Sequence, residues 1–268
     1  DIGVSVRIRI PEVSVRNGAH LKYVVGDKAT ILPVSGAEKT ESEYSFILSV
    51  APAEMTDTIN VKYIYDDNEV MVYSGTAADI VMTALSQAED TTMELFLKSM
   101  LNYGTQAQLF FVHNADKLAN SLLDESDKAL TAISAGNLLS YSYRILDKDS
   151  NIDFIGQAIT LDSIVTSKFY FSGEITLEMC TVNGTEITSD DIGTDEKGTY
   201  IAICDIAPEN FDKSFTIIVG DVEVTNASVF SYLYTALKNE RTDLLDLVYS
   251  MYSYNQVAKL YKDCDKRV

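Results

Sequence analysis

The helical segments of this chain occur twice, at a nearly constant offset. Thr83-Ala84-Leu85 recurs as Thr235-Ala236-Leu237, an offset of 152 residues, and Ser99-Met100 recurs as Ser250-Met251, an offset of 151. Further upstream, Ala51-Pro52 is answered by Ala207-Pro208. An internal repeat of this length predicts that one structural unit is built twice.

The positions that match between the copies share one apolar stripe. Their steps of three and four residues place them on a single face of a helix, which predicts that this face is buried. Thr76 with Asp79 and Thr91 with Glu94 fit the pattern that caps a helix start. Each copy is therefore predicted to hold a helix of about ten residues, a short turn and a helix of about twenty. The stripe comprises Met93, Phe96, Leu97, Met100, Tyr103, Ala107 and Phe110, matched by Leu244, Leu247, Val248, Met251, Tyr254, Ala258 and Tyr261.

Strand patterns precede both helix pairs. Residues 4–10 and 59–65 alternate apolar with polar, and Asp66-Asp67-Asn68 predicts a hairpin turn into 70–73. The sequence predicts an α+β fold: two tandem copies of a small antiparallel β-sandwich-like unit, each closed by an amphipathic helix pair. In the second copy the predicted strands are 140–146, 166–171, 174–181, 199–204 and 214–225, with Asn183-Gly184 as a hairpin turn.

The boundary between the copies is predicted near residue 130. Residues 114–123 and 124–134 are predicted as short helices, and no linker rich in proline or in glycine and serine separates the copies. We therefore expect a first module at 1–130, a second, divergent copy at 131–268 and a stiff junction between them.

The formal charge of -19 limits the partners. An acidic surface repels nucleic acid and anionic membranes, so it serves solubility, or it attracts cations or a basic partner. No apolar run reaches the roughly 18 residues of a membrane span, so we expect no membrane insertion. The three cysteines show no C-x-x-C spacing, and Cys180 and Cys204 either pair across a sheet or stay as free buried thiols.

A segment near the end of the first copy resembles a known type of module. Leu101 to Phe111, which reads LNYGTQAQLFF, followed by Leu118-Ala119-Asn120, is similar to a repeated module of large cell-surface and secreted proteins of gut and rumen clostridia. The second copy departs from this pattern, with Asn255 in place of Gly104. The resemblance implies an extracellular module in a longer chain, and it supplies no catalytic residues to carry over.

The sequence contains no recognised catalytic motif. There are two histidines, and neither a G-x-S-x-G elbow nor an H-E-x-x-H pair occurs. Catalysis by paired carboxylates stays open, since forty acidic residues make chance pairs common. We expect no catalytic site, no cofactor and no enzymatic activity.

One acidic loop has part of the spacing of a calcium loop. The candidate ligands are Asp147, Asp149, Asn151 and Asp153. Ile152 stands where such a loop needs glycine, and Ala158 where it needs glutamate, so a solvated hairpin turn is the alternative. Asp190-Asp191 and Asp195-Glu196 form a second acidic region that would have to lie nearby to complete a site.

Sixteen tyrosines and no tryptophan distinguish the aromatic composition. Tyr63, Tyr65 and Tyr73 are predicted to share a sheet face, where they either stack against sugar rings or pack against the helices. The leading hypothesis is a non-enzymatic extracellular or cell-surface module, which spaces neighbouring modules or binds another protein. The alternative is a carbohydrate-binding or adhesion module whose exposed tyrosines contact a glycan or a surface protein.

Overall fold

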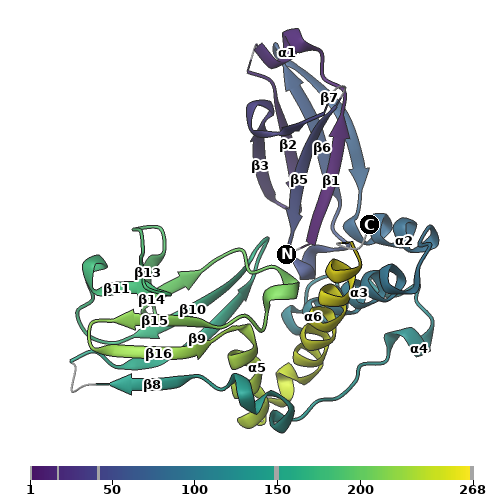
Figure 1. The fold of residues 1–268 in the computed structure, drawn as a ribbon. Coiled ribbons are helices and arrows are strands. Elements are labelled where there is room, and N and C mark those ends of the chain that lie inside the picture. The colour runs from purple at the N-terminus through teal and green to yellow at the C-terminus, as the bar shows by residue number, and fades with distance from the viewer. Residues whose placement is uncertain (1, 17, 41–42, 148–150, 266–268) are drawn as a thin grey trace. The chain divides into compact units, whose positions relative to one another are not determined.

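The computed structural model describes residues 2–16, 18–40, 43–147 and 151–265 (Figure 1). The fold is mixed α+β, and every strand pairing in these residues is antiparallel. The chain divides into two compact units, Asp1–Lys128 and Ala129–Val268.

The first unit contains two sheets, one of three strands and one of four. The three-stranded sheet has the order β1-β5-β4, and the four-stranded sheet has the order β3-β2-β6-β7. A single helical turn, α1 (Glu12–Arg16), follows β1. The strands are β1 (Ile2–Ile8), β2 (His20–Val25), β3 (Lys28–Pro33), β4 (Glu38–Lys39), β5 (Tyr44–Val50), β6 (Ile59–Tyr65) and β7 (Asn68–Gly75).

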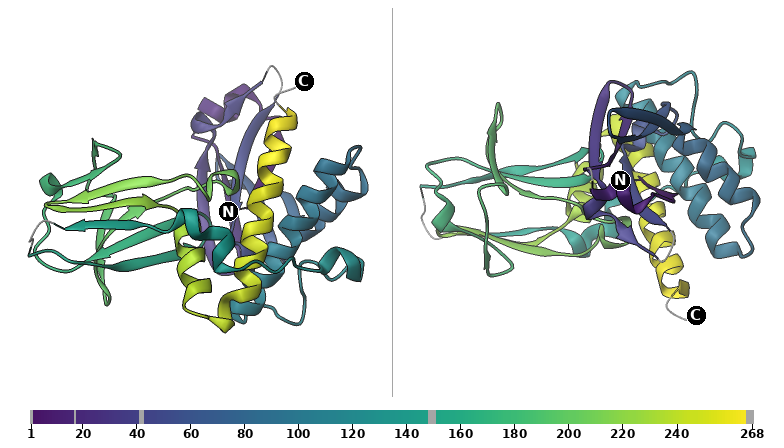
Figure 2. Two further views of the ribbon diagram at one scale, coloured as in Figure 1. Left: turned by 60° about the horizontal axis from the view of Figure 1, so that its bottom comes forward. Right: turned by 90° about the horizontal axis from the view of Figure 1, so that it is seen from above.

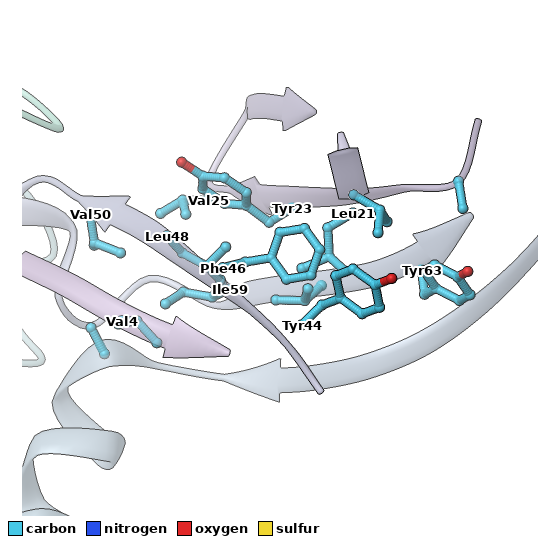
Figure 3. Close-up of a cluster of buried hydrophobic side chains, with 14 residues drawn as sticks. Val4, Leu21, Tyr23, Val25, Tyr44, Phe46, Leu48, Val50, Ile59 and Tyr63 are labelled. Carbon is cyan, nitrogen blue, oxygen red and sulfur yellow. The ribbon is translucent and has the colours of Figure 1, made fainter. Parts of the chain in front are cut away.

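Alternation along the strands builds the core of the first unit. Every second residue of β2 and β5 is buried, and Leu21 and Leu48 have no exposed surface. These side chains meet Val4 of β1 and Ile59 of β6 in one cluster that joins both sheets (Figure 3). Burial of each such side chain contributes about 1.5–3 kcal/mol.

The predicted hairpin after β6 is confirmed. Tyr65 pairs with Asn68, so Asp66 and Asp67 form a two-residue turn. Their φ angles of 43° and 62° are both positive, as the turn type that matches the twist of a hairpin requires. Aspartate tolerates this conformation better than most residues because its short side chain bonds locally.

Two helices complete the first unit, and they lie side by side in both views of Figure 2. Thr76 caps α2 (Ala77–Ser86) as predicted, because its side chain accepts a hydrogen bond from the Asp79 N–H. The predicted cap of α3 (Thr91–Phe111) was wrong by one residue, since Asp90 accepts from Met93 instead. A carboxylate is as good a cap as a hydroxyl, and the two adjacent candidates were not separable by pattern.

The segment after α3 is mostly irregular. The short helix predicted at 114–123 is absent from the described residues, and of 124–134 only α4 (Glu125–Lys128) is helical. The backbone groups there bond to side chains of α3 in place of a helical ladder. A sequence pattern that reports helix propensity does not register such tertiary bonds.

The second unit also contains two sheets, of four and five strands, in the orders β13-β14-β10-β9 and β12-β11-β15-β16-β8. Buried side chains of both sheets, including Phe169, Ile201 and Val219, form one cluster. The strands are β8 (Arg144–Asp147), β9 (Phe154–Leu161), β10 (Val165–Phe171), β11 (Cys180–Val182), β12 (Thr185–Glu186), β13 (Ile192–Asp195), β14 (Gly198–Ile203), β15 (Phe215–Val219) and β16 (Val222–Ala227).

Two predicted strands of the second unit are confirmed only in part. In 140–146, residues 144–146 belong to β8, while 140 and 141 end a 3-10 helix, η3 (Ala135–Tyr141). In 174–181, Cys180 and Thr181 belong to β11, and a 3-10 helix, η4 (Leu177–Met179), precedes them. The hairpin predicted at Asn183-Gly184 is confirmed, because Val182 pairs with Thr185 and both turn residues have positive φ.

The helices of the second unit follow the predicted lengths. Ser228 caps α5 (Val229–Lys238), which has ten residues like α2, and α6 (Leu245–Asp265) has twenty-one like α3. A short 3-10 turn, η6 (Thr242–Leu244), leads into α6.

Candidate functional site

The predicted tyrosine strip lies on the core side of the four-stranded sheet. Tyr63 is 8% exposed and belongs to the core cluster, in which Figure 3 labels it. Its ring stacks on that of Tyr65 with centroids 5.2 Å apart. Tyr73 pairs across from Val61 on the same face, and its hydroxyl donates to the Thr76 carbonyl at 3.3 Å.

These contacts favour the packing alternative for the strip. Burial raises the pKa of Tyr63 and of Tyr73, as expected for phenols held against a core. A ring face covered by the core is not open to a sugar. Binding of a glycan by Tyr63, Tyr65 and Tyr73 stays a prediction.

The calcium candidates are only partly described. Asp149 lies outside the described residues, as does the side chain of Asp147. Asn151 is exposed, and Asp153 exchanges hydrogen bonds with Ser172, whose backbone N–H donates to the Asp153 carbonyl at 2.9 Å. In the part of the chain that the structure describes, no group of three or more His, Cys, Asp or Glu side chains is arranged to hold a metal ion.

The alternative of a solvated hairpin turn at this loop is wrong. β8 pairs with β16 in the five-stranded sheet, whereas β9 pairs with β10 in the four-stranded one, so the loop passes from one sheet to the other. Ile152, which replaces the glycine of a calcium loop, is 4% exposed and belongs to the core cluster. Its apolar side chain anchors the crossing.

The second acidic region forms local bonds. Asp191 accepts from the backbone and side chain of Thr188, and these bonds lower the pKa of Asp191. Asp195 accepts from the Lys197 N–H and from the Tyr170 hydroxyl at 2.9 Å. Burial, together with this bond to Asp195, raises the pKa of Tyr170 to about 12.

The segment that carries the family resemblance forms a buried polar network. Gln108 has no exposed surface, and its amide donates to the Thr56 hydroxyl at 2.7 Å and to the Lys117 carbonyl at 3.1 Å. The Gln108 side-chain oxygen accepts from the Ala119 N–H at 2.8 Å. All three bonds tie the irregular segment after α3, or the turn before β6, to the helix.

A second part of the network lies nearer the start of α3, at Asn102 and Thr105. Asn102 donates to the Asp127 carbonyl at 2.7 Å and accepts from the Asn120 amide at 2.8 Å. The Asn120 N–H donates to the Thr105 hydroxyl at 2.9 Å. Polar residues of the resembling segment thus serve to hold backbone in place.

The two histidines have separate surroundings. The Nε2 atom of His113 lies 3.0 Å from both carboxylate oxygens of Asp57, and Asn114 also bonds to that carboxylate. His20 contacts the Gly18 carbonyl at 3.4 Å. Cys180 is buried and Cys204 is exposed, and both are free thiols, so the predicted alternative of a disulfide between them is wrong.

A small pocket in the second unit is the best candidate for a ligand site. Its volume is about 160 Å³, and Tyr143, Gln157, Tyr232, Asn239 and Arg241 contribute to its walls. These residues come from the connection between η3 and β8, from β9, from α5 and from the turn that leads to α6. Ala236 and Leu244, which are 6% and 4% exposed, add apolar surface.

Hydrogen bonds fix one wall of the pocket. The Gln157 amide donates to the Ser228 carbonyl at 2.8 Å and accepts from the Ser231 hydroxyl at 2.8 Å, so β9 is fastened to the start of α5. Tyr143 is held by an edge-to-face contact with Phe154, at 5.3 Å between centroids. The fold itself therefore holds these walls of the pocket in place without a ligand.

The turn after α5 sets the opposite wall. Arg241 forms a two-pronged ion pair with Asp243, with bonds of 2.9 and 2.6 Å, so the pair carries no net charge. Burial raises the pKa of the Tyr232 phenol, while the charge of Arg241 opposes the rise. The phenol therefore stays protonated near neutral pH and can donate a hydrogen bond.

Sequence reasoning did not single out this pocket. Its residues come from four separate elements, and none belongs to a motif. One signal was present in the repeat: at an offset of 152, Tyr232 answers Ile80, whereas Thr235 and Ala236 answer the identical Thr83 and Ala84. The offset changes to 151 after this helix, so Arg241 answers an acidic residue, Glu89 at 152 or Asp90 at 151.

Among the described residues, no helix is both long and apolar enough to span a bilayer. Compared with protein-family models, with curated proteins and with solved structures, the chain matches none.

Proposed function

We propose that the chain consists of two tandem copies of one module, a β-sandwich closed by a helix pair, and that it belongs to a larger extracellular or cell-surface protein. In this proposal the modules are not enzymes. They space neighbouring modules or bind another protein.

The same contact between a 3-10 turn and the helix pair occurs in both units, and it supports the tandem copies. In the first unit a 3-10 turn, η2 (Pro52–Glu54), lies against α3, and the Met55 carbonyl accepts from the Ala78 N–H at 2.9 Å. In the second unit η5 (Pro208–Asn210) lies against α6, and the Phe211 carbonyl accepts from the Phe230 N–H at 3.0 Å. The repeat aligns Ala78 with Phe230 at its offset of 152.

This contact also explains why the copies differ at one position, where the first has Gly104 and the second has Asn255. A Cβ atom on Gly104 would lie 2.2 Å from the Met55 sulfur and 3.2 Å from the Pro52 carbonyl, so a side chain here would force Met55 and the turn to shift. The aligned Asn255 is fully buried and donates to the Pro208 carbonyl at 2.7 Å. In each unit the long helix therefore meets the carbonyl of the proline in the turn. Gly104 allows a close contact with Pro52, and Asn255 donates a hydrogen bond to Pro208.

The observation that carries the non-enzymatic role is the buried network around Gln108 and Asn102. Polar residues in a recurring segment are the first candidates for catalysis. Here they are 0% and 7% exposed, and their side-chain hydrogen bonds go to neighbouring segments of the same unit, outside α3. Their surroundings support a structural role for the segment that resembles the clostridial modules.

An activity screen tests the non-enzymatic role. The purified chain is incubated with plant polysaccharides, peptidoglycan and casein, and released sugars and peptides are quantified. We expect no turnover above that of the heat-unfolded chain. Turnover that disappears with one Asp→Asn or Glu→Gln substitution would refute the proposal.

Limited proteolysis tests the modular organisation. Most side chains between residues 129 and 134 are exposed, and this stretch has no helix or strand, so a non-specific protease is expected to cut there first. Two resistant fragments, one for each unit, would result. First cleavage inside a sheet of either unit would contradict two independently folded modules.

A further inference from the structure

We propose that the pocket between β9 and α5 of the second unit binds one neutral sugar ring. This inference goes beyond the proposed spacing role and does not depend on it, because it rests only on the size, the walls and the charge of the pocket.

The size of the pocket sets the size of the ligand. A volume of about 160 Å³ corresponds to roughly five water molecules at about 30 Å³ each. Pockets for drug-sized molecules are larger, at about 300–1,000 Å³. A single six-membered ring with its substituents therefore fits, whereas an oligosaccharide would have to extend outside.

The walls offer both kinds of contact that a sugar needs. The rings of Tyr143 and Tyr232, together with Ala236 and Leu244, present apolar surface to the C–H groups of a pyranose. Among the described residues, no hydrogen bond engages the two tyrosine hydroxyls or the Asn239 amide. These groups donate and accept, as do sugar hydroxyls.

The charge of the site favours a neutral ligand. Asp243 already satisfies Arg241 through two hydrogen bonds, so the guanidinium is a poor counter-ion for a second carboxylate. The formal charge of -19 repels anions from the surface as a whole. A neutral hydroxyl can still bond to the exposed edge of the ion pair, so an uncharged sugar is preferred over an acidic one.

The first copy offers an internal comparison. It keeps the small apolar residue, with Ala84 at the position of Ala236, but it has Ile80 at the position of Tyr232 and an acidic residue, Glu89 or Asp90, at that of Arg241. The shared residue supports the helix packing, and the two replaced residues are those that would face a sugar. This pattern fits a site that one copy has and the other lacks.

The test is an NMR titration of the full chain. The probes are the methyl glycosides of glucose, galactose, mannose, xylose and N-acetylglucosamine, each followed by amide shifts of the ¹⁵N-labelled protein. We expect at least one probe to shift the Asn239 and Arg241 amides saturably, with a dissociation constant in the millimolar range that few-contact ligands of this size reach.

Variants taken from the first copy locate the site. Tyr232→Ile introduces the side chain of the aligned Ile80, and Arg241→Glu introduces the acidic charge found at the aligned position. Each is expected to weaken binding about fivefold or more, the first through loss of an aromatic contact and the second through loss of a charged donor. The matched control, Ile80→Ala in the first copy, is expected to leave binding unchanged. If Tyr232→Ile fails to fold, Asn239→Ala, at an exposed position, takes its place.

Three results would overturn the proposal. The first is the absence of any saturable shift at Asn239 or Arg241 with all five probes. The second is tighter binding of methyl glucuronide than of methyl glucoside at the same amides. The third is unchanged affinity in a folded Tyr232→Ile variant.

Discussion

Replacing Gln108 by alanine tests whether the segment LNYGTQAQLFF is a structural element. The Gln108 side chain makes three hydrogen bonds, to Thr56, to Lys117 and to Ala119, and it has no exposed surface. The substitution removes all three. It also leaves the Ala119 N–H and the Lys117 carbonyl without their partner in a site closed to water.

The expected loss of stability follows from these bonds. Each hydrogen bond contributes about 1 kcal/mol, and a buried group left unsatisfied adds to the cost. The higher helix propensity of alanine returns a few tenths of a kcal/mol. Gln108→Ala is therefore expected to destabilise the first unit by roughly 3 kcal/mol, with most of the effect on the segment that follows α3.

Hydrogen exchange measured by mass spectrometry reports the loss of stability separately for each peptide of the chain. A loss of roughly 3 kcal/mol corresponds to about a hundredfold faster exchange, since about 1.4 kcal/mol is a factor of ten. Peptides that contain Ala119 should show this change, while peptides from β5 and β6 change less. The matched control is Gln106→Ala, on the same helix and only half-buried, which is expected to change exchange by less than about threefold. Equal effects of the two variants would refute the structural role of Gln108.

Further outcomes are expected at Val112, at Tyr170 and at the cysteines. Val112 ends α3 with φ at 54°, a left-handed conformation that is costly for a β-branched residue. Val112→Gly should therefore raise the free energy of unfolding by about 1 kcal/mol in urea titrations, and a lower midpoint would contradict this. Asp195→Ala should lower the pKa of Tyr170 from about 12, though burial keeps it above its ordinary value; ultraviolet titration measures this, and an unchanged pKa would exclude a role for the carboxylate. The unfolded chain releases the Tyr170 proton at a lower pH than the folded chain does. The second unit should therefore lose stability as pH rises from about 10 to about 12, and an unfolding midpoint that stays constant over this range would contradict the prediction. Finally, a thiol reagent should modify exposed Cys204 faster than Cys180, whose pKa burial raises, and a reducing agent should leave the melting temperature unchanged; a drop would indicate a disulfide.

Local patterns predicted the elements that depend on few neighbours. The helix lengths, the cap at Thr76 and the turn at Asp66-Asp67 follow from residues close together in sequence, and the structure contains all of them. Predictions failed where distant contacts decide the conformation. The stretch from Asn114 to Leu123 has helix-forming residues, yet Gln108 and Thr105 bind its backbone in an irregular path.

β9 shows a different limit. Its sequence, FIGQAITL, contains a glycine and no charged residue, and its start overlaps the stretch that has part of the spacing of a calcium loop. The strand is fixed by its pairing with β10 along the whole length and by Gln157, which bonds to the start of α5 some 70 residues later. Neither partner is visible in a local window, and the same long-range contacts build the candidate pocket.

The turn after α5 contains a strained backbone residue and also forms one wall of that pocket. Glu240 adopts φ of 53°, a left-handed conformation that costs an ordinary residue about 1–2 kcal/mol. In return, the Arg241 N–H bonds to the Ala236 carbonyl and the Glu240 N–H to Leu237, which closes the helix end. Ala88, which the sequence repeat aligns with Glu240 at an offset of 152, does not adopt this conformation in the first unit. The strained turn places Asn239 and Arg241 on one wall of the pocket, so the two units differ in backbone at the position where they also differ in the residues proposed to bind a sugar.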